Sequence, residues 1–217
     1  MSLHLDARQR AMLQEMGVTI WAPAQVSAAP APVNDAARSQ RTAAEPPTPA
    51  LVLHAAQALY PTADPAQTPA GLGAGWLVVA ESLSPTEPLA GDAGRLLDNM
   101  LRAMQLHRHP RVFLAALERP QAGNATNALE IAPALNEMVA TLRPAMVLVL
   151  GHVAARAALG RTEPLGRLRA ELHQLAGCPA IVTYDPAFLL RSQGNKGAAW
   201  ADLCRALALV HATTVQP

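Results

Sequence analysis

The stretch that decides the fold is P-A-M-V-L-V-L-G-H-V-A-A-R-A-A-L-G, residues 144–160. Its first half contains an unbroken apolar run at 146–150, which has the length and composition of a strand buried on both faces. Residues 151–159 then have the mixed small, apolar and basic pattern of an amphipathic helix. A strand that leads directly into a helix is the repeating unit of an α/β domain.

Similar apolar runs and helical patterns alternate along most of the chain. We expect strands at 76–80, 111–115, 146–150 and 180–184, and helices around 93–105, 128–142, 151–159 and 197–210. Because helices separate the strands, the sheet is expected to be mostly parallel with right-handed crossovers. The predicted fold is a three-layer α/β/α sandwich. Functional groups of such sheets gather where strands end, which is where Glu81 and Asp185 stand.

Composition narrows the class of protein. The chain has 217 residues, 51% of them hydrophobic, and a net charge of +1, so it can bury a sizeable core but has no global positive field. Cys178 and Cys204 are isolated in the sequence, and a zinc or iron–sulfur site needs about four converging ligands. We therefore expect buried thiols and neither metal nor cofactor. There is no secretory signal and no bilayer-length apolar run, which predicts a cytoplasmic protein.

Three zones divide the chain. In residues 1–21, Asp6 and Gln9 form a capping-box pattern, and Gly17 is positioned to end the short helix. Residues 22–50 are rich in Ala and Pro and lack large apolar groups, which is typical of a flexible linker. Residues 51–217 carry the α/β pattern. We expect a tethered N-terminal element, a linker and one domain.

The segment I-V-T-Y-D-P-A-F-L-L-R, residues 181–191, resembles the "TYHPAYLLR" signature of the uracil-DNA glycosylase superfamily, above all its iron–sulfur branch. The stretch 144–160 resembles the family's "P-x-hydrophobic-LG-xx-A" segment. Further similarity at 165–169, Lys196 and 200–203 extends the match over roughly residues 72–207. The resemblance implies a uracil-DNA glycosylase-like fold.

The resemblance also implies that the catalytic groups have changed. Glu81 retains the acid of the family's "GEAPG" segment, but Leu89 replaces the stacking phenylalanine of "PFVGxAGxLLDxML". The base-reading asparagine of "YIxN" falls near Ala115 or Ala116, and Asp185 stands where the family has a histidine that stabilises the leaving uracil anion. The cluster cysteines are absent as well. We therefore expect no catalysis from the degenerate positions Glu81, Leu89, Ala116 and Asp185.

Alternatives remain open at several positions. Glu81 and Asp185 could form an acid/base pair, or Asp185 could cap a helix that begins at Pro186. His152 and His173 are interpreted as surface or hydrogen-bonding histidines. Arg191 and Lys196 are candidate DNA-phosphate contacts or ordinary solvated charges.

A second resemblance concerns the N-terminus. M-L-Q-E-M-G-V-T-I-W, residues 12–21, is similar to the "LQxLGIxxW" start of the bacterial DNA polymerase III psi subunit, whose N-terminal peptide docks on the clamp loader and whose domain binds chi. Apolar and aromatic side chains on a tethered peptide suit such docking, although residues 1–21 could instead fold back onto the domain. The expected anchors are Leu13, Met16, Val18, Ile20 and Trp21.

The leading hypothesis is therefore a non-catalytic, psi-like accessory subunit of the replicative DNA polymerase III holoenzyme. Its expected partners are the clamp-loader subunits (tau/gamma), a chi-like subunit and DNA through the holoenzyme, with no membrane. The rival is a divergent uracil-DNA glycosylase of base-excision repair that uses Glu81 to activate water. A third hypothesis is a protein that binds damaged DNA without cleaving it.

Overall fold

The computed structural model describes residues 51–81, 83–119 and 131–215. The expectations for the N-terminal peptide and for the linker at 22–50 lie outside these ranges. None of the helices in the described ranges is long and apolar enough to cross a bilayer.

Four parallel strands form the centre of the sheet, in the order β4-β3-β5-β7. They are β3 (Trp76–Ala80), β4 (Val112–Glu118), β5 (Met146–Leu150) and β7 (Cys178–Thr183). Because these strands run the same way, their carboxyl ends meet at one edge of the sheet.

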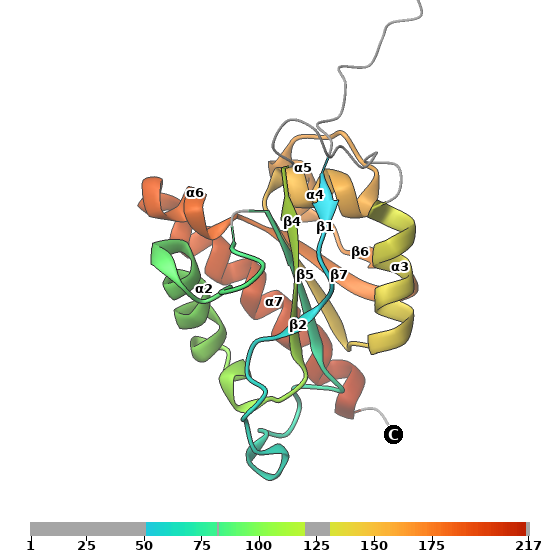
Figure 1. The fold of residues 1–217 in the computed structure, drawn as a ribbon. Coiled ribbons are helices and arrows are strands. Elements are labelled where there is room, and N and C mark those ends of the chain that lie inside the picture. Colours follow the sequence, from blue (N-terminus) through green and yellow to red (C-terminus); the bar gives the residue numbers. More distant parts are fainter. Residues whose placement is uncertain (1–50, 82, 120–130, 216–217) are drawn as a thin grey trace, which may run out of the picture. The chain divides into compact units, whose positions relative to one another are not determined.

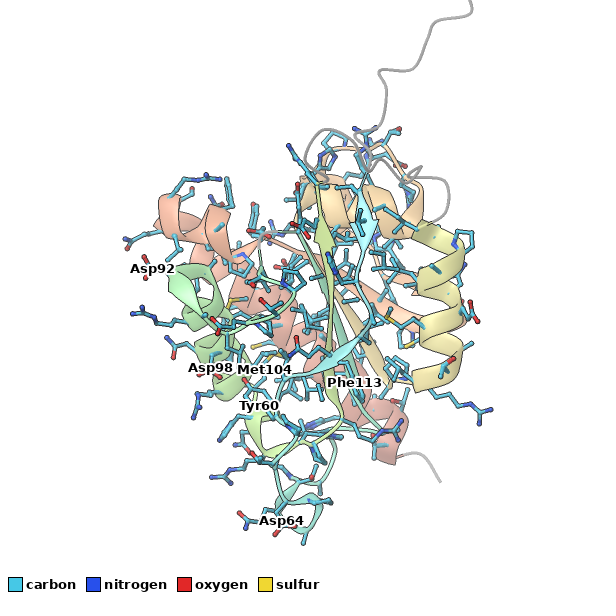
Figure 2. All side chains as sticks on the ribbon, viewed as in Figure 1. Tyr60, Asp64, Asp92, Asp98, Met104 and Phe113 are labelled. Carbon is cyan, nitrogen blue, oxygen red and sulfur yellow. The ribbon has the colours of Figure 1, made fainter. Side chains whose placement is uncertain are left out.

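Short antiparallel strands extend this parallel centre on both sides, so the sheet is mixed. Both β1 (Val52–Leu53) and β2 (Gln57–Ala58) pair with β4. At the other border, β6 (His173–Leu175) pairs with β7 across a two-residue turn. The hydroxyl of Tyr60, just after β2, donates a 2.6 Å hydrogen bond to Asp98, which attaches this segment to helix α2 (Figure 2).

Helices cover both faces of the sheet, as Figure 1 shows. One face carries α2 (Gly91–Ala103), α6 (Pro186–Arg191) and α7 (Lys196–Val215), and the other carries α3 (Ile131–Leu142), α4 (His152–Leu159) and α5 (Leu165–Ala170). Single 3-10 turns lie at Pro65–Gln67, Leu106–Arg108 and Gln193–Asn195. The expected three-layer α/β/α fold is therefore confirmed.

The two cores follow from the two-residue period of a strand. In β3, Trp76 and Val78 belong to the core under α2 and α7, whereas Leu77 and Val79 belong to the core under α3, α4 and α5. Alternate side chains of a strand point to opposite faces, so an all-apolar run supplies both cores at once. This is why the apolar runs in the sequence correspond to central strands.

The sequence predicted the central elements better than the border ones. The strands expected at 76–80 and 146–150 are observed with those bounds, while β4 runs on to Glu118 and β7 begins at Cys178. The strands β1, β2 and β6 and the helix α5 were not predicted, and α6 was expected only as one of two alternatives for Asp185. Each is only two to six residues long, too short for a hydrophobic period to be recognised.

Candidate functional site

A cavity of about 460 Å³ opens at the carboxyl ends of the parallel strands. Its polar lining comes from segments far apart in the sequence, which the parallel order of the strands brings together. The lining side chains that carry charge or a ring are Glu81, Glu118, Arg119, His152, Asp185, Phe188 and Arg191. Glu81 and Asp185, both expected at the ends of strands, line this one cavity.

Asp185 caps helix α6. Its extended backbone (φ −70°, ψ 140°) precedes Pro186, and its carboxylate accepts a 2.8 Å hydrogen bond from the backbone N–H of Ala187. Proline at the first helical position leaves one fewer backbone N–H to satisfy, and a carboxylate is among the preferred N-caps. Of the two interpretations of Asp185, the structure bears out the helix cap.

Gly151 packs directly against Asp185. Its backbone N–H donates a 2.9 Å hydrogen bond to the carbonyl of Thr183, which joins the end of β5 to the end of β7. Gly151 has a φ of +93°, and a Cβ added there would lie 2.9 Å from the Cβ of Asp185. Only glycine allows both this backbone conformation and this close approach. The floor of the cavity is therefore fixed by a Gly–Asp contact.

Glu81 forms an ion pair with Arg119 across the ends of β3 and β4. The neighbouring Glu118 contacts the imidazole of His54 at 2.8 Å. Glu81 is mostly buried, but Arg119 is largely exposed, so water screens the pair. Any reaction that used Glu81 to activate water would first have to displace or share this guanidinium.

A buried polar network supports the wall of the cavity. Asp202 of α7 accepts hydrogen bonds from the Thr183 hydroxyl (2.8 Å) and from Nε of Arg169 (2.7 Å). The Arg169 guanidinium lies 3.9 Å from the centre of the Tyr184 ring, which stacks on Phe188 with ring centroids 5.2 Å apart. Through this chain of contacts, α7 fixes the aromatic side chain that lines the cavity.

Two of the four positions at which the resemblance implies a changed residue do not line the cavity. Leu89 packs against the core under α2 and α7, and Ala116 is buried within β4 in the same core. Neither is among the described residues that line the cavity, so the structure does not bring these two positions together with Glu81 and Asp185 there. Ala116 belongs to the core under α2 and α7, whereas Glu118, the last residue of β4, lies at the open carboxyl end of the strand.

Arg191 and Lys196, the candidate phosphate contacts, line different surfaces. Arg191 borders the cavity beside Asp185 and Phe188. Lys196 instead borders an apolar groove between α2, α6 and α7. The two cations therefore do not form a single anion-binding surface among the described residues.

Both histidines donate hydrogen bonds to backbone carbonyls, as expected of hydrogen-bonding histidines. Nε2 of His152 lies 3.1 Å from the carbonyl of Glu163, and Nε2 of His173 lies 2.7 Å from that of Leu168. The first contact joins α4 to the segment before α5, and the second joins β6 to α5. Both rings are thereby held by backbone carbonyls.

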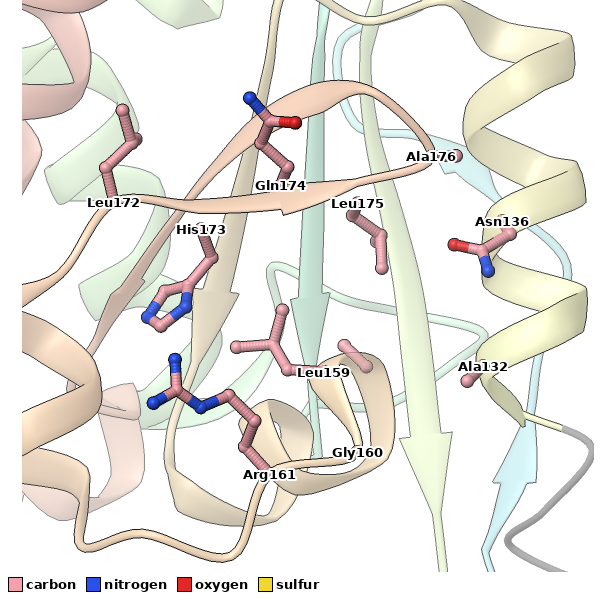
Figure 3. Close-up of a pocket in the computed structure, with 11 residues that line it drawn as sticks. Ala132, Asn136, Leu159, Gly160, Arg161, Leu172, His173, Gln174, Leu175 and Ala176 are labelled. Carbon is pink, nitrogen blue, oxygen red and sulfur yellow. The ribbon is translucent and has the colours of Figure 1, made fainter.

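A second cavity, of about 550 Å³, lies between α3, α4 and β6 (Figure 3). Arg161 on its wall bonds to Glu163 and Glu171, so its charge is already compensated. The hydrogen bond from Arg161 lowers the pKa of Glu163 to about 2. Because its cation is already paired, this cavity is a weaker candidate than the one at the strand ends.

The fold and the cavity together define a three-layer α/β protein whose polar residues gather at the carboxyl ends of four parallel strands. The family model described as the Uracil DNA glycosylase superfamily matches residues 80–204, more than half of the chain. The chain belongs to the uracil DNA glycosylase superfamily. No curated protein matches the sequence.

Three charged or aromatic residues of the cavity were not predicted from the sequence: Glu118, Arg119 and Phe188. A surface arginine such as Arg119 carries no sequence signal of its pairing with Glu81. Phe188 was visible inside the 181–191 motif, yet its role depends on stacking against Tyr184. The available signal for Phe188 was its position just after the end of a strand, where functional side chains gather.

Proposed function

We propose that this chain is a non-catalytic, psi-like accessory subunit of the replicative DNA polymerase III holoenzyme, built on a uracil-DNA glycosylase-like domain. The proposal that the chain is non-catalytic rests on the role of Asp185 as a helix cap. Its carboxylate caps α6 at the position where the family resemblance implies a histidine. A negative charge there repels the uracil anion that glycosidic cleavage releases.

The surroundings of Asp185 support the same proposal. The cavity also contains the carboxylates of Glu81 and Glu118, which add negative charge where the leaving base would have to be stabilised. The carboxylate of Glu81 already forms an ion pair with Arg119. The loss of a single group that stabilises a developing anion costs about 2.7–4 kcal/mol of transition-state stabilisation. Changes at several such groups leave little catalytic power.

The accessory role is motivated by residues 12–21. In this proposal Leu13, Met16, Val18, Ile20 and Trp21 dock on the clamp-loader subunits (tau/gamma), while the domain binds a chi-like subunit. Apolar anchors on a tethered peptide provide affinity at the entropic cost of ordering it. Contact with DNA then comes through the holoenzyme.

A pull-down of the full chain with clamp-loader subunits tests the docking. Capture should be lost in the Leu13→Ala/Trp21→Ala double variant and kept in a matched Val26→Ala/Val33→Ala variant of the expected linker. If the first variant is captured as well as the unaltered chain, the peptide is not the docking element. Absence of capture for the unaltered chain also overturns the proposal.

The rival function, a divergent uracil-DNA glycosylase, is favoured by one observation: Glu81 lines the cavity at the end of β3. Incubation of the full chain with uracil-containing single- and double-stranded DNA separates the two. We expect no abasic product from the unaltered protein or from Glu81→Ala. Cleavage that disappears in Glu81→Ala would establish the glycosylase instead.

A further inference from the structure

A narrow apolar groove of about 230 Å³ runs between α2, α6 and α7. Leu189 and Leu203 form its buried floor, and Leu96, Met100 and Trp200 stand along its walls. Of the described side chains that line it, only those of Asn99 and Lys196 are polar. Binding of apolar groups in such a groove is favourable, because it removes apolar surface from water.

One of the exposed large apolar side chains of the described residues, that of Trp200, lines this groove. Among the described residues, those most exposed are Leu172, Phe188, Leu190 and Trp200, and three of the four lie on α6 and α7. Trp200 is 42% exposed although it lines the groove. Lys196, Trp200 and Leu203 follow helical spacing, so they share one face of α7. Tryptophan at the edge of an apolar groove is typical of a protein-binding hot spot.

The charges beside the groove are mainly positive. Lys196 lines it, and Arg95 is exposed on α2 four residues before the groove residue Asn99, hence on the same side of that helix. Nearby carboxylates are already engaged: Asp98 bonds to Tyr60 and Arg102, and Asp202 bonds to Arg169. Asp92 is exposed in the first turn of α2, four residues before the groove residue Leu96, so that side of the helix carries one acidic group beside the two cations. A partner with acidic flanks therefore complements this surface.

We propose that the α2–α6–α7 groove binds an amphipathic α-helix of a partner protein, with an apolar stripe that enters the groove and Asp or Glu residues that face Lys196 and Arg95. Such a helix offers anchors at i, i+3, i+4 and i+7, which suit a groove bordered by helices. A second copy of the chain would bring like charges together. A nucleic acid would meet an aliphatic floor with one aromatic ring instead of a stacking platform.

This surface consists of residues different from those that the proposed function assigns to the clamp loader, so either proposal can fail alone. The probe is a fluorescently labelled helical peptide of about 20 residues with leucines at i, i+3, i+4 and i+7 and glutamates on both flanks. A second peptide has lysines in place of the glutamates. Fluorescence anisotropy with the full chain gives the Kd of each.

We expect the glutamate-flanked peptide to bind at least about tenfold more tightly than the lysine-flanked one. Trp200→Ala should raise its Kd at least about tenfold, and Lys196→Glu should reverse the preference between the two peptides. Leu172→Ala removes an exposed leucine that lines the cavity between α3, α4 and β6, so it should leave both Kd values unchanged. Urea unfolding of each variant verifies that the domain remains folded.

Equal affinity for the two peptides, no binding of either, or an unchanged Kd in Trp200→Ala would overturn the proposal. Two further results would assign the groove to another occupant and overturn it too. One is a dimer in sedimentation that Trp200→Ala dissociates. The other is binding of a single-stranded oligonucleotide that the same variant abolishes.

Discussion

A Cβ atom at position 151 would lie 2.9 Å from the Cβ of Asp185, closer than such atoms pack in proteins. The turn after β5 and the cap of α6 therefore fit together only because one of the two residues is glycine. This contact joins the strand–helix unit at 144–160 to the motif at 181–191. It ties the two most family-like segments of the chain to one point of the cavity.

The first prediction concerns this contact. Gly151→Ala combines a left-handed backbone (φ +93°) with the close approach to Asp185, and we expect it to lower the free energy of unfolding by about 2–4 kcal/mol. Gly160→Ala is the matched control, because Gly160 also has a positive φ (+64°) but nothing within 4 Å of an added Cβ. It should cost only about 1 kcal/mol. Urea denaturation measures both, and equal losses would show that the contact with Asp185 is unimportant.

The second prediction concerns the cap of α6. Asp185→Ala removes the acceptor for the Ala187 N–H and should lower the free energy of unfolding by about 1 kcal/mol or more, whereas Asp185→Asn should retain most of it. Asp64→Ala is the control, because Asp64 accepts a similar hydrogen bond from the N–H of Ala66 in an exposed 3-10 turn. It should cost about 0.5 kcal/mol or less. The capping role is refuted if Asp185→Ala unfolds at the same urea concentration as the unaltered chain.

The third prediction concerns the buried carboxylate of Asp202. Its removal leaves Arg169 without its carboxylate and Thr183 without its acceptor, both inside the protein. We expect Asp202→Ala to lower the free energy of unfolding by about 3 kcal/mol or more. The exposed Asp92→Ala should stay within about 0.5 kcal/mol of the unaltered protein. Chemical denaturation measures both free energies of unfolding. Equal values for the two variants would contradict a stabilising role of the Asp202 hydrogen bonds.

The fourth prediction concerns pH and the two thiols. Burial raises the pKa of Cys178 to about 11, so its thiol stays protonated and unreactive near pH 8, and only becomes a thiolate as the pH approaches 11. Cys204 is exposed. Treatment of the folded protein with iodoacetamide at pH 8 should add one label, at Cys204, while the unfolded protein takes two. Mass spectrometry of Cys204→Ser provides the control, and rapid labelling of that folded variant would contradict the burial of Cys178.

Local pattern was enough to predict the central elements. The apolar runs 76–80 and 146–150 became β3 and β5, and the helical periods became α2, α3, α4 and α7. The 181–191 motif identified the family and pointed to Asp185 as a residue at the strand ends. These inferences succeeded because each depends on neighbours along the chain, where side-chain period and capping preferences act directly.

The composition of the cavity could not be predicted in the same way. Leu89 and Ala116 match site positions of the family motifs, but Ala116 is buried in the core under α2 and α7, and Leu89 packs against the same core. The ion pair of Glu81 with Arg119 depends on β3 and β4 lying side by side. A single sequence does not specify which side chains meet across adjacent strands.

The sequence by itself determined the class of fold and the family. Only the tertiary structure decided what Asp185 does, which cations share its cavity, and that Lys196 and Trp200 border an apolar groove. The physical reason is distance along the chain. Secondary structure follows from free energies that neighbouring residues set, whereas a site is formed by strand order and helix packing, which bring together residues separated by dozens of positions.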